Sequence, residues 1–291
     1  MTVDYVIRHG RYEEIPVPGR PLGRQKLTDS RSAAYPYQAA RPRRITDVDH
    51  PRHIPTLNQG FYGSCEGDAE VGCAATSPLY EALPASHPAL DQALAYRVYA
   101  LATTLDGFPG TFTYPPPGGA DTGTDSTSAS KAAGKLGLFS GYLHAAALTD
   151  VLNALMEKAV NLAFDWYEGM DDPAPDGGVE IAGAIRGGHA LCSRGVDAGR
   201  RRVWLDQSWG LPWGVDGRCY LTWDQLDQLL AEDGECIVPV AASAPPPVPV
   251  PVPGRDAKLW ETAGPWCAQT RTRADLVILK GALEEWHTSP A

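Results

Sequence analysis

The chain has 291 residues with 43% hydrophobic side chains, and 25 Lys and Arg against 35 Asp and Glu give a formal net charge of −10. This length and composition allow a sizeable buried core together with terminal extensions. The acidic balance argues against a general nucleic-acid or anionic-membrane surface, since either needs a basic face.

Residues 1–43 are rich in Pro, Gly and Arg and show no sustained helical or strand period, which predicts an extended N-terminal arm. The first residues lack the apolar core of a signal peptide, and no run of the chain approaches transmembrane length. We therefore expect a protein made for the cytoplasm, or for a particle assembled there.

A glycine-rich turn follows at residues 58–67, with the sequence Asn-Gln-Gly-Phe-Tyr-Gly-Ser-Cys-Glu-Gly. It leads into a helix expected over residues 65–75, with Ser64 as its N-cap and Cys65 in its first turn. Unpaired N–H groups and the positive end of the helix dipole favour a thiolate there. Gln59 can direct a side-chain N–H at an oxyanion forming beside the sulfur. A lone cysteine is more often a small buried hydrophobe, so this interpretation depends on later segments.

The rest of the body is expected to contain helices and strands in alternation. Apolar spacing predicts helices over residues 89–105, 128–136, 149–159 and 223–230, and strands over 160–166, 181–196, 202–205 and 219–222. The strands at 181–196 and 202–205 form a predicted hairpin around a polar tip. This hairpin brings His189 and Gln207 onto neighbouring strands.

The six cysteines are Cys65, Cys73, Cys192, Cys219, Cys236 and Cys267. No two of them have the C-x-x-C spacing of zinc ligands, and we expect neither a metal nor an organic cofactor. If one cysteine is a free nucleophile, the other five cannot all pair within one chain. A reduced setting is the simpler expectation.

Residues 244–253, largely alternating prolines, predict a stiff polyproline II linker of roughly 30 Å. The segment beyond it, residues 254–291, contains Trp260, Trp266 and Trp286 and is too short to bury a core alone. We expect this segment to dock. It either tethers the protein to a large assembly such as a phage particle or packs on its own body.

Three motifs occur in one order along the chain. They are Gln59-Gly60-Phe61-Tyr62-Gly63-Ser64-Cys65-Glu66, then Gly188-His189-Ala190, then Gln207-Ser208-Trp209-Gly210-Leu211-Pro212-Trp213-Gly214. Together they resemble the papain-like cysteine peptidases, in a bacterial or phage-encoded subtype without a large pro-domain. The resemblance covers roughly residues 22–240. It implies an α+β papain-like two-lobed fold, with a helical lobe and an antiparallel β-barrel-like lobe, for a peptidase domain at 44–243 between the arm and the C-terminal appendage.

The resemblance also implies the site residues. Cys65 is the nucleophile, His189 the general base, Gln207 the residue that orients His189, and Gln59 an oxyanion donor. Substrate-binding positions are Gly123, Thr124, Asp125, Ser126, Gly188 and Trp209, although residues 123–126 are equally an ordinary capped start of a helix.

Three positions depart from the family pattern. Glu66 replaces Trp and opposes thiolate formation by its charge. Gln207 replaces Asn and is longer by one methylene, and Tyr62 replaces a disulfide cysteine of secreted members. These departures leave two alternatives to hydrolysis of protein substrates: a weak or inactive papain-like module serving as an attachment component, for example of a phage head or tail, and thiol-dependent amide chemistry on cell-wall peptides. Abundant Ala, Gly, Pro and Arg are typical of a GC-rich genome and suggest an actinobacterium or its phage.

Overall fold

The computed structural model describes residues 4–8, 11–15, 20–26, 34–39, 43–116 and 118–247. All of them belong to one unit, residues 1–248. The predicted docking segment 254–291, Cys267 within it and most of the linker 244–253 lie outside the described residues.

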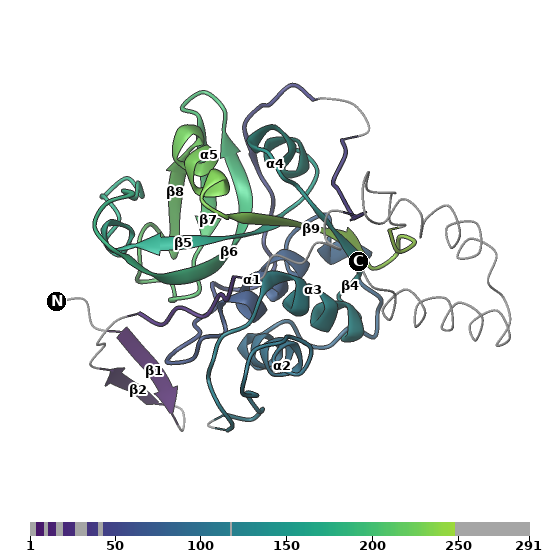
Figure 1. Cartoon of the computed structure of the whole chain (residues 1–291), viewed down its shortest axis with the longest axis vertical. Helices are drawn as coiled ribbons and strands as arrows, with labels where there is room; N and C mark the ends of the chain where they lie inside the picture. The colour runs from purple at the N-terminus through teal and green to yellow at the C-terminus, as the bar shows by residue number, and fades with distance from the viewer. Residues whose placement is uncertain are drawn as a thin grey trace, which may run out of the picture. The chain divides into compact units, whose positions relative to one another are not determined.

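Three helices form one lobe (Figure 1): α1 (Cys65–Ala74), α2 (Gln92–Ala102) and α3 (Ser126–Lys135). Two of them begin at side-chain caps, because Asp91 accepts a hydrogen bond from Leu94 N–H and Asp125 accepts one from Ser128 N–H. These caps explain why α2 starts later, and α3 earlier, than the apolar spacing predicts. A short 3₁₀ helix, Tyr80–Ala82, lies between α1 and α2 in the chain.

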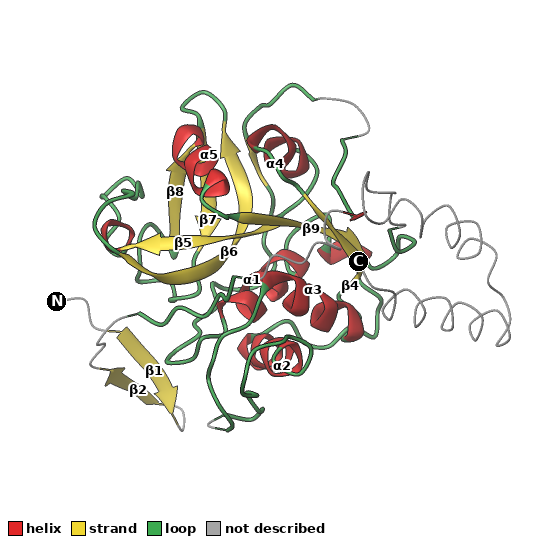
Figure 2. Cartoon of the chain, viewed as in Figure 1, coloured by secondary structure: helices red, strands yellow, loops and turns green. Residues whose placement is uncertain are grey.

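A seven-stranded antiparallel sheet forms the second lobe (Figure 2). Its strands are β3 (Val48–Asp49), β4 (Phe139–His144), β5 (Val160–Tyr167), β6 (Ile185–Asp197), β7 (Arg202–Asp206), β8 (Arg218–Thr222) and β9 (Glu235–Ala241). The order is β4-β9-β5-β6-β7-β8, and β3 pairs with β6. The predicted hairpin is the β6–β7 pair, whereas β4 and β9 were not expected from the sequence. The α+β prediction is confirmed.

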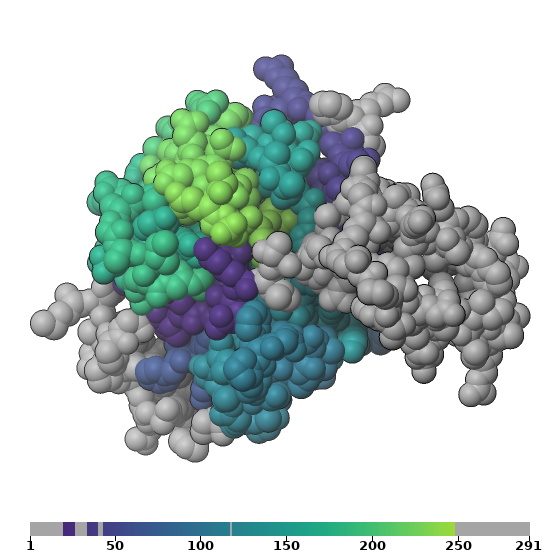
Figure 3. Space-filling view, viewed as in Figure 1, coloured from purple at the N-terminus to yellow at the C-terminus, as the bar shows by residue number. Residues whose placement is uncertain are grey.

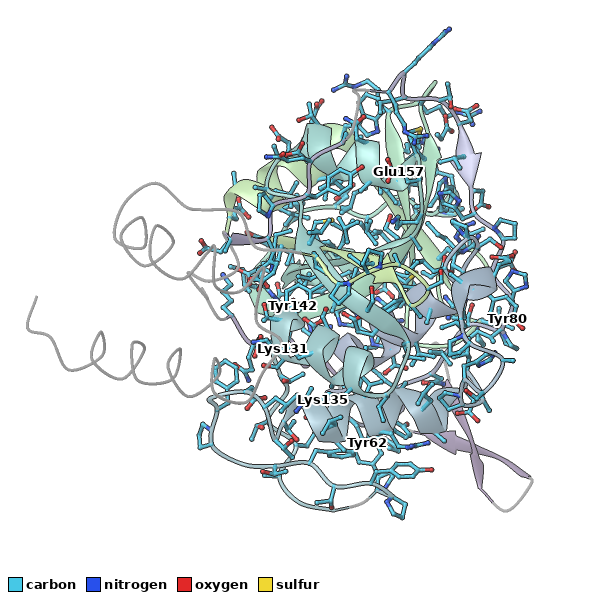
Figure 4. The ribbon with its side chains drawn as sticks, turned by 90° about the vertical axis from the view of Figure 1, so that its right-hand side faces the viewer. Tyr62, Tyr80, Lys131, Lys135, Tyr142 and Glu157 are labelled. Atoms are coloured by element: carbon cyan, nitrogen blue, oxygen red, sulfur yellow. The ribbon has the colours of Figure 1, made fainter. Side chains whose placement is uncertain are left out.

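Two further helices pack on the sheet and complete its core. They are α4 (Leu148–Leu155) and α5 (Trp223–Ala231), and a 3₁₀ turn, Glu168–Met170, follows β5. Val151 and Leu155 of α4 join Leu226 and Leu229 of α5 in the core cluster that the strands β5 to β8 fill from the other side. Figure 4 shows where the helical lobe meets the sheet: Lys131 and Lys135 lie on α3, and Tyr142 lies on the adjacent strand β4.

Small residues join the two lobes. Cys65 and Ala69 of α1 pack with Ala163 of β5 and Ala190 of β6 in a buried cluster. At Gly72, an added Cβ would lie 2.9 Å from the Cβ of Cys192 on β6. Because no bulky side chain separates the helix from the sheet, the first turn of α1 lies directly against the segment of β6 that carries His189.

The N-terminal segment departs from the prediction. Residues Asp4–Arg8 form β1 and Arg11–Ile15 form β2, which pair antiparallel with Asp4 opposite Ile15. No strand was predicted within residues 1–43, so these two paired strands were missed. The run Tyr5-Val6-Ile7 has high β-propensity, but it is too short to stand out within a segment rich in Pro and Gly.

Candidate active site

The thiol of Cys65 lies at the start of α1 and is completely buried. Ser64 occupies the N-cap position, but its hydroxyl donates to Asp68 Oδ2 at 2.8 Å and makes no capping bond. Burial raises the pKa of the Cys65 thiol, and the charge of Glu66 raises it further. Backbone hydrogen bonds from Ala190 and Gly23 act in the opposite direction. In this state the thiol is therefore neutral.

Glu66 and Glu70 are buried carboxyl groups on the first two turns of α1. Ser126 Oγ donates to Glu66 Oε1 at 2.8 Å, and Asn161 Nδ2 donates to Glu66 Oε2 at 3.0 Å and to Glu70 Oε1 at 3.1 Å. Burial raises the pKa of Glu66 to about 8. When ionised, Glu66 raises the pKa of Cys65 and so opposes thiolate formation, as expected. At pH 7, however, this carboxyl is mainly protonated.

His189 on β6 and Gln207, directly after β7, are joined by a 2.5 Å hydrogen bond between Nε2 and Oε1. The backbone N–H of Ser208 donates to the same Oε1 at 2.8 Å, which identifies this atom as the amide oxygen. Nε2 of His189 must then carry the proton, so Nδ1 holds the basic lone pair. Among the described residues Nδ1 has no hydrogen-bond partner. The ring is completely buried, and this burial lowers its pKa to about 4.

Two indole rings enclose the imidazole. Trp209 stacks on His189 with ring centroids 5.0 Å apart and an interplanar angle of 20°. Trp166 meets the same ring edge-on at 5.1 Å. These rings shield the His189–Gln207 pair from water.

Asp206, adjacent to Gln207, faces another direction. It forms ion pairs with Arg52 at 2.6 Å, Arg194 at 2.7 Å and Arg218 at 2.9 Å. Burial opposes its ionisation, but the three guanidinium groups outweigh burial and hold the pKa of this carboxyl below its usual range. Successive side chains on a strand alternate in direction, so Gln207, and not Asp206, meets His189.

The N-terminal arm lies across this site (Figure 3), where the purple residues 20–26 run between the green sheet lobe and the teal helical lobe. The N–H of Arg24 donates to Gly188 O at 3.0 Å, that of Gln25 to Thr124 O at 2.9 Å, and that of Thr124 to Gly23 O at 2.8 Å. Both walls of the cleft thus hold the arm by backbone hydrogen bonds.

The arm lies close against the nucleophile turn at Gly23. A Cβ added there would stand 1.9 Å from Gly63 O, so only glycine fits. A cavity of about 400 Å³ follows the arm and is lined by Asp121 and Gly123 of the helical lobe and by Arg186 and Gly188 of the sheet lobe.

Gln59 already binds a carbonyl of the arm. Its Nε2 donates to Tyr62 O at 2.7 Å and to Pro21 O at 3.2 Å, while its Oε1 accepts a 2.5 Å bond from Ser208 Oγ. Trp209 Nε1 donates to the same Pro21 carbonyl at 3.3 Å.

Residues 123–126 were predicted either to bind substrate or to form an ordinary capped helix start, and they show features of both. Thr124 pairs with the arm and Ser126 contacts Glu66, as a cleft wall requires. Asp125 caps α3. Gly123 has a φ of +74°, and its N–H donates a hydrogen bond to the Tyr99 hydroxyl. Gly188 and Trp209 both contact the arm.

Sequence reasoning missed several residues of this region: Gly23, Arg24, Asn161, Ser208 and Glu235. Apart from Ser208, which lies inside the third motif, they belong to segments far apart in the chain that only the fold brings together. Where secreted relatives of the predicted family have a cysteine, Tyr62 packs edge-on against Tyr96 and Phe112.

The five cysteines within the described ranges, Cys65, Cys73, Cys192, Cys219 and Cys236, are all free thiols. Over the same ranges no three His, Cys, Asp or Glu side chains are placed to hold a metal ion. None of the helices in the described part is long and apolar enough to span a membrane.

No protein-family model matches the chain, and no curated protein sequence does either. Solved structures do resemble it. Xylellain, a cysteine protease from Xylella fastidiosa, is 16% identical with a TM-score of 0.53, over 78% of this chain and 94% of that one. Digestive procathepsin L 3 of the Tenebrio molitor larval midgut is 14% identical with a TM-score of 0.54, over 76% of each chain.

The fold is therefore papain-like, as the motifs implied, and the solved structures that share it are papain-like cysteine proteases. At these identities the likeness concerns the fold.

Proposed function

We propose that this chain is a cysteine peptidase that hydrolyses peptide bonds with Cys65 as nucleophile, His189 as base and Gln207 as the residue that positions the base. One observation carries the proposal: the buried hydrogen bond from His189 Nε2 to Gln207 Oε1, which leaves Nδ1 as the basic nitrogen. Cys65 accepts a backbone hydrogen bond from Ala190, the neighbour of His189. The nucleophile and the base therefore belong to one small cluster.

In the proposed reaction, Nδ1 of His189 takes the proton of Cys65 as the sulfur bonds to the carbonyl carbon of the substrate. The C–N bond then breaks, the amine leaves with the proton returned by His189, and a thioester remains on Cys65. Water, deprotonated by His189, attacks the thioester; the C–S bond breaks, the sulfur of Cys65 regains the proton from His189, and a carboxylic acid is released.

Gln59 supplies a donor for the oxyanion. One of its N–H groups is retained by Tyr62 O, and the other is donated to Pro21 O of the arm. When the arm leaves, this second N–H and the backbone N–H of Cys65 at the start of α1 are available to a substrate carbonyl.

The test uses a full-length chain whose arm cannot seat, Gly23→Ala, since its added Cβ would overlap Gly63 O. Cys65 is alkylated with iodoacetamide across pH 4–9, followed by peptide mass spectrometry, with and without His189→Ala. We expect Cys65 to react fastest, with an apparent pKa below the free value of about 8.5 that is lost without His189. Labelling of Cys65 no faster than that of Cys73 would contradict the proposal.

The second candidate is a non-catalytic papain-like module that serves as an attachment component. The observations that favour it are the neutral thiol, the neutral His189 and the arm that covers both. It predicts no peptide hydrolysis by Gly23→Ala and no effect of His189→Ala on alkylation. A bacterial or phage origin, a cytoplasmic or virion location, and a cell-wall peptide as substrate remain predictions.

A further inference from the structure

The two proposed oxyanion donors both depend on the nucleophile turn, residues 59–64. Gln59 begins this turn, and its side-chain Nε2 donates to Tyr62 O at 2.7 Å, so the amide moves with the backbone of the turn. The backbone N–H of Cys65 directly follows the last residue of the turn. Because small displacements of a donor from an oxyanion are costly in rate, the contacts that hold this turn in place contribute to catalysis.

The carboxylate of Asp121 holds the end of this turn. The N–H of Gly63 donates to both of its oxygens, with Oδ1 and Oδ2 each 3.0 Å from the nitrogen. Asp121 lies on the loop before α3, 58 positions from Gly63 in the sequence. The bond therefore ties the turn to the helical-lobe wall of the cleft. A hydrogen bond to an ionised acceptor of this kind is roughly twice as strong as one between neutral groups.

Tyr99 fixes the orientation of Asp121 from the core of the helical lobe. This residue of α2 is completely buried. Its hydroxyl donates to Asp121 Oδ1 at 2.6 Å and accepts the N–H of Gly123 at 2.9 Å. Burial and the hydrogen bond to Asp121 raise the pKa of this hydroxyl, so it remains a donor at neutral pH. One carboxylate thus joins the nucleophile turn to α2 and, through the tyrosine, to the cleft wall at Gly123.

The arm supports the same turn, but a substrate has to displace the arm. Gly23 packs so closely on the turn that an added Cβ would stand 1.9 Å from Gly63 O. When the arm leaves, side chains of the helical lobe hold the backbone of the turn at two places within the described residues. The Tyr96 hydroxyl donates to Gln59 O at 3.1 Å and holds the start of the turn. Asp121 holds its end, beside the nucleophile.

We propose that Asp121 is a positioning residue for hydrolysis, which keeps the two oxyanion donors, the Gln59 amide and the Cys65 N–H, directed at one point. This inference rests on the proposed peptidase function. It assigns Asp121 no contact with the reacting atoms and no part in the transfer of the thiol proton to His189. Loss of the carboxylate therefore slows the steps that form an oxyanion and leaves the reactivity of the thiol itself intact.

Two reactions of the same thiol separate this role from a structural one. Hydrolysis forms an oxyanion when the sulfur of Cys65 bonds to the carbonyl carbon. Alkylation by iodoacetamide forms a C–S bond as the C–I bond breaks and iodide leaves, and no oxyanion arises. Both reactions require a folded chain with an open arm. The ratio of their rates is therefore independent of the folded and open fractions.

The experiment measures hydrolysis of fluorescein-labelled casein and alkylation of Cys65 in the full-length Gly23→Ala chain, with and without Asp121→Ala. We expect Asp121→Ala to lower the ratio of hydrolysis to alkylation by about 10- to 100-fold, while the pH profile of alkylation stays the same. Asp121→Asn keeps one oxygen acceptor for Gly63 and should restore part of the lost ratio. Urea unfolding shows whether each variant is folded.

Tyr99→Phe perturbs Asp121 from a side that the substrate does not touch, because Tyr99 is completely buried. It should lower the same ratio. Added to Asp121→Ala, it should change the ratio by less than about twofold, since the two residues act through one contact. The matched control is Asp227→Ala, which removes a carboxylate from an exposed position on α5 and should leave the ratio unchanged.

The outcomes distinguish this inference from the proposed function. A ratio that Asp121→Ala leaves unchanged overturns the inference, even if both rates fall together, while the proposed function stands. A Gly23→Ala chain that hydrolyses nothing, with alkylation indifferent to His189→Ala, overturns the proposed function and this inference with it. If Gly23→Ala does not fold, the unmodified chain replaces it, because the ratio cancels the fraction of molecules with an open arm.

Discussion

His189 and Gln207 are joined through Nε2 and Oε1 at 2.5 Å, and the same Oε1 accepts the N–H of Ser208 at 2.8 Å. A glutamine side chain, longer by one methylene than the asparagine of the papain-like pattern, therefore places its amide oxygen where the imidazole needs an acceptor. Its Nε2 has no partner among the described residues. The backbone N–H of Ser208, with a longer 3.4 Å contact from its hydroxyl, fixes which end of the amide faces the ring.

Replacing Gln207 by Leu removes the acceptor and keeps the volume. We expect Cys65 alkylation and peptide hydrolysis in the Gly23→Ala chain to fall by about 10- to 100-fold, since Nε2 no longer has to carry the proton. The buried ring N–H and Ser208 N–H are left unpaired, which lowers the free energy of unfolding by about 1–3 kcal/mol.

Alkylation rates against pH and urea unfolding measure the two effects separately. Gln228→Leu, an exposed glutamine on α5, is the control and should leave the alkylation rate unchanged. If Gln207→Leu loses stability but keeps the full rate, Gln207 has a structural role and does not position His189.

Particular residues show how much of this site the sequence could predict. Cys65, His189 and Gln207 carry their chemistry in local motifs, and the alternation along a strand separates Asp206 from Gln207 in advance. No local motif indicates that the arm lies against the site. Gly23 matters because the Gly63 carbonyl approaches within 1.9 Å of a would-be Cβ, and Glu235 accepts a hydrogen bond from Ser126 because β9 returns beside α3. Both relationships arise from tertiary packing between segments far apart in the chain, and the strands β4 and β9 were missed for the same reason.

Burial also changes the protonation state of one residue that the sequence did identify. Glu66 adjoins Cys65 in the sequence, and from sequence its charge was expected to oppose the thiolate. Its enclosure by Ser126 and Asn161 raises its pKa to about 8, which no local pattern reveals.

We expect the arm to limit access to Cys65, because it lies against the nucleophile turn and the thiol is completely buried. Reaction of the buried thiol requires the arm to open, so the rate scales with the open fraction. Gly23→Ala, which cannot seat against Gly63 O, should raise the alkylation rate of Cys65 at pH 7 by at least about tenfold.

Gly107→Ala is the matched control, because an added Cβ there meets nothing within 4 Å, and it should label like the unmodified chain. Equal rates for all three chains would show that the arm does not limit access to the thiol.

The buried carboxyls of α1 predict how stability depends on pH. Burial raises the pKa of Glu66 from 4.5 to about 8 and that of Glu70 from 4.5 to about 7. Below about pH 4.5 both groups are protonated in the folded and unfolded chains, and their contribution is fully present. As the pH rises toward 8 the unfolded chain releases these protons first, so the free energy of unfolding falls, by at most about 1.4 kcal/mol per pH unit and group.

Thermal unfolding between pH 7 and 8.5 tests this, in a range above the pKa of 6.5 at which His189 titrates in the unfolded chain. Glu66→Gln keeps the shape of the side chain and should flatten the decline, whereas Glu180→Gln, at an exposed position, should not. A melting temperature that rises across this range would contradict the assignment.

The stacking of Trp209 on His189 predicts a linked change in basicity. Burial is the main cause that lowers the pKa of His189 to about 4, and the indole covers one face of the ring at 5.0 Å. Trp209→Leu admits water to that face, so the pKa of His189 should move upward toward its ordinary value of 6.5. The lost packing also lowers the free energy of unfolding by about 3 kcal/mol.

The titration is followed by NMR of histidine labelled at Cε1, with the His189 signal assigned by its loss in His189→Ala. Trp204→Leu is the control, because this indole packs against Tyr220 and Arg218 on the neighbouring strand β8. The control should leave the pKa near 4. An unchanged pKa in Trp209→Leu would mean that Trp166 and the sheet alone exclude water from the ring, and that the Trp209 stack serves to position the imidazole.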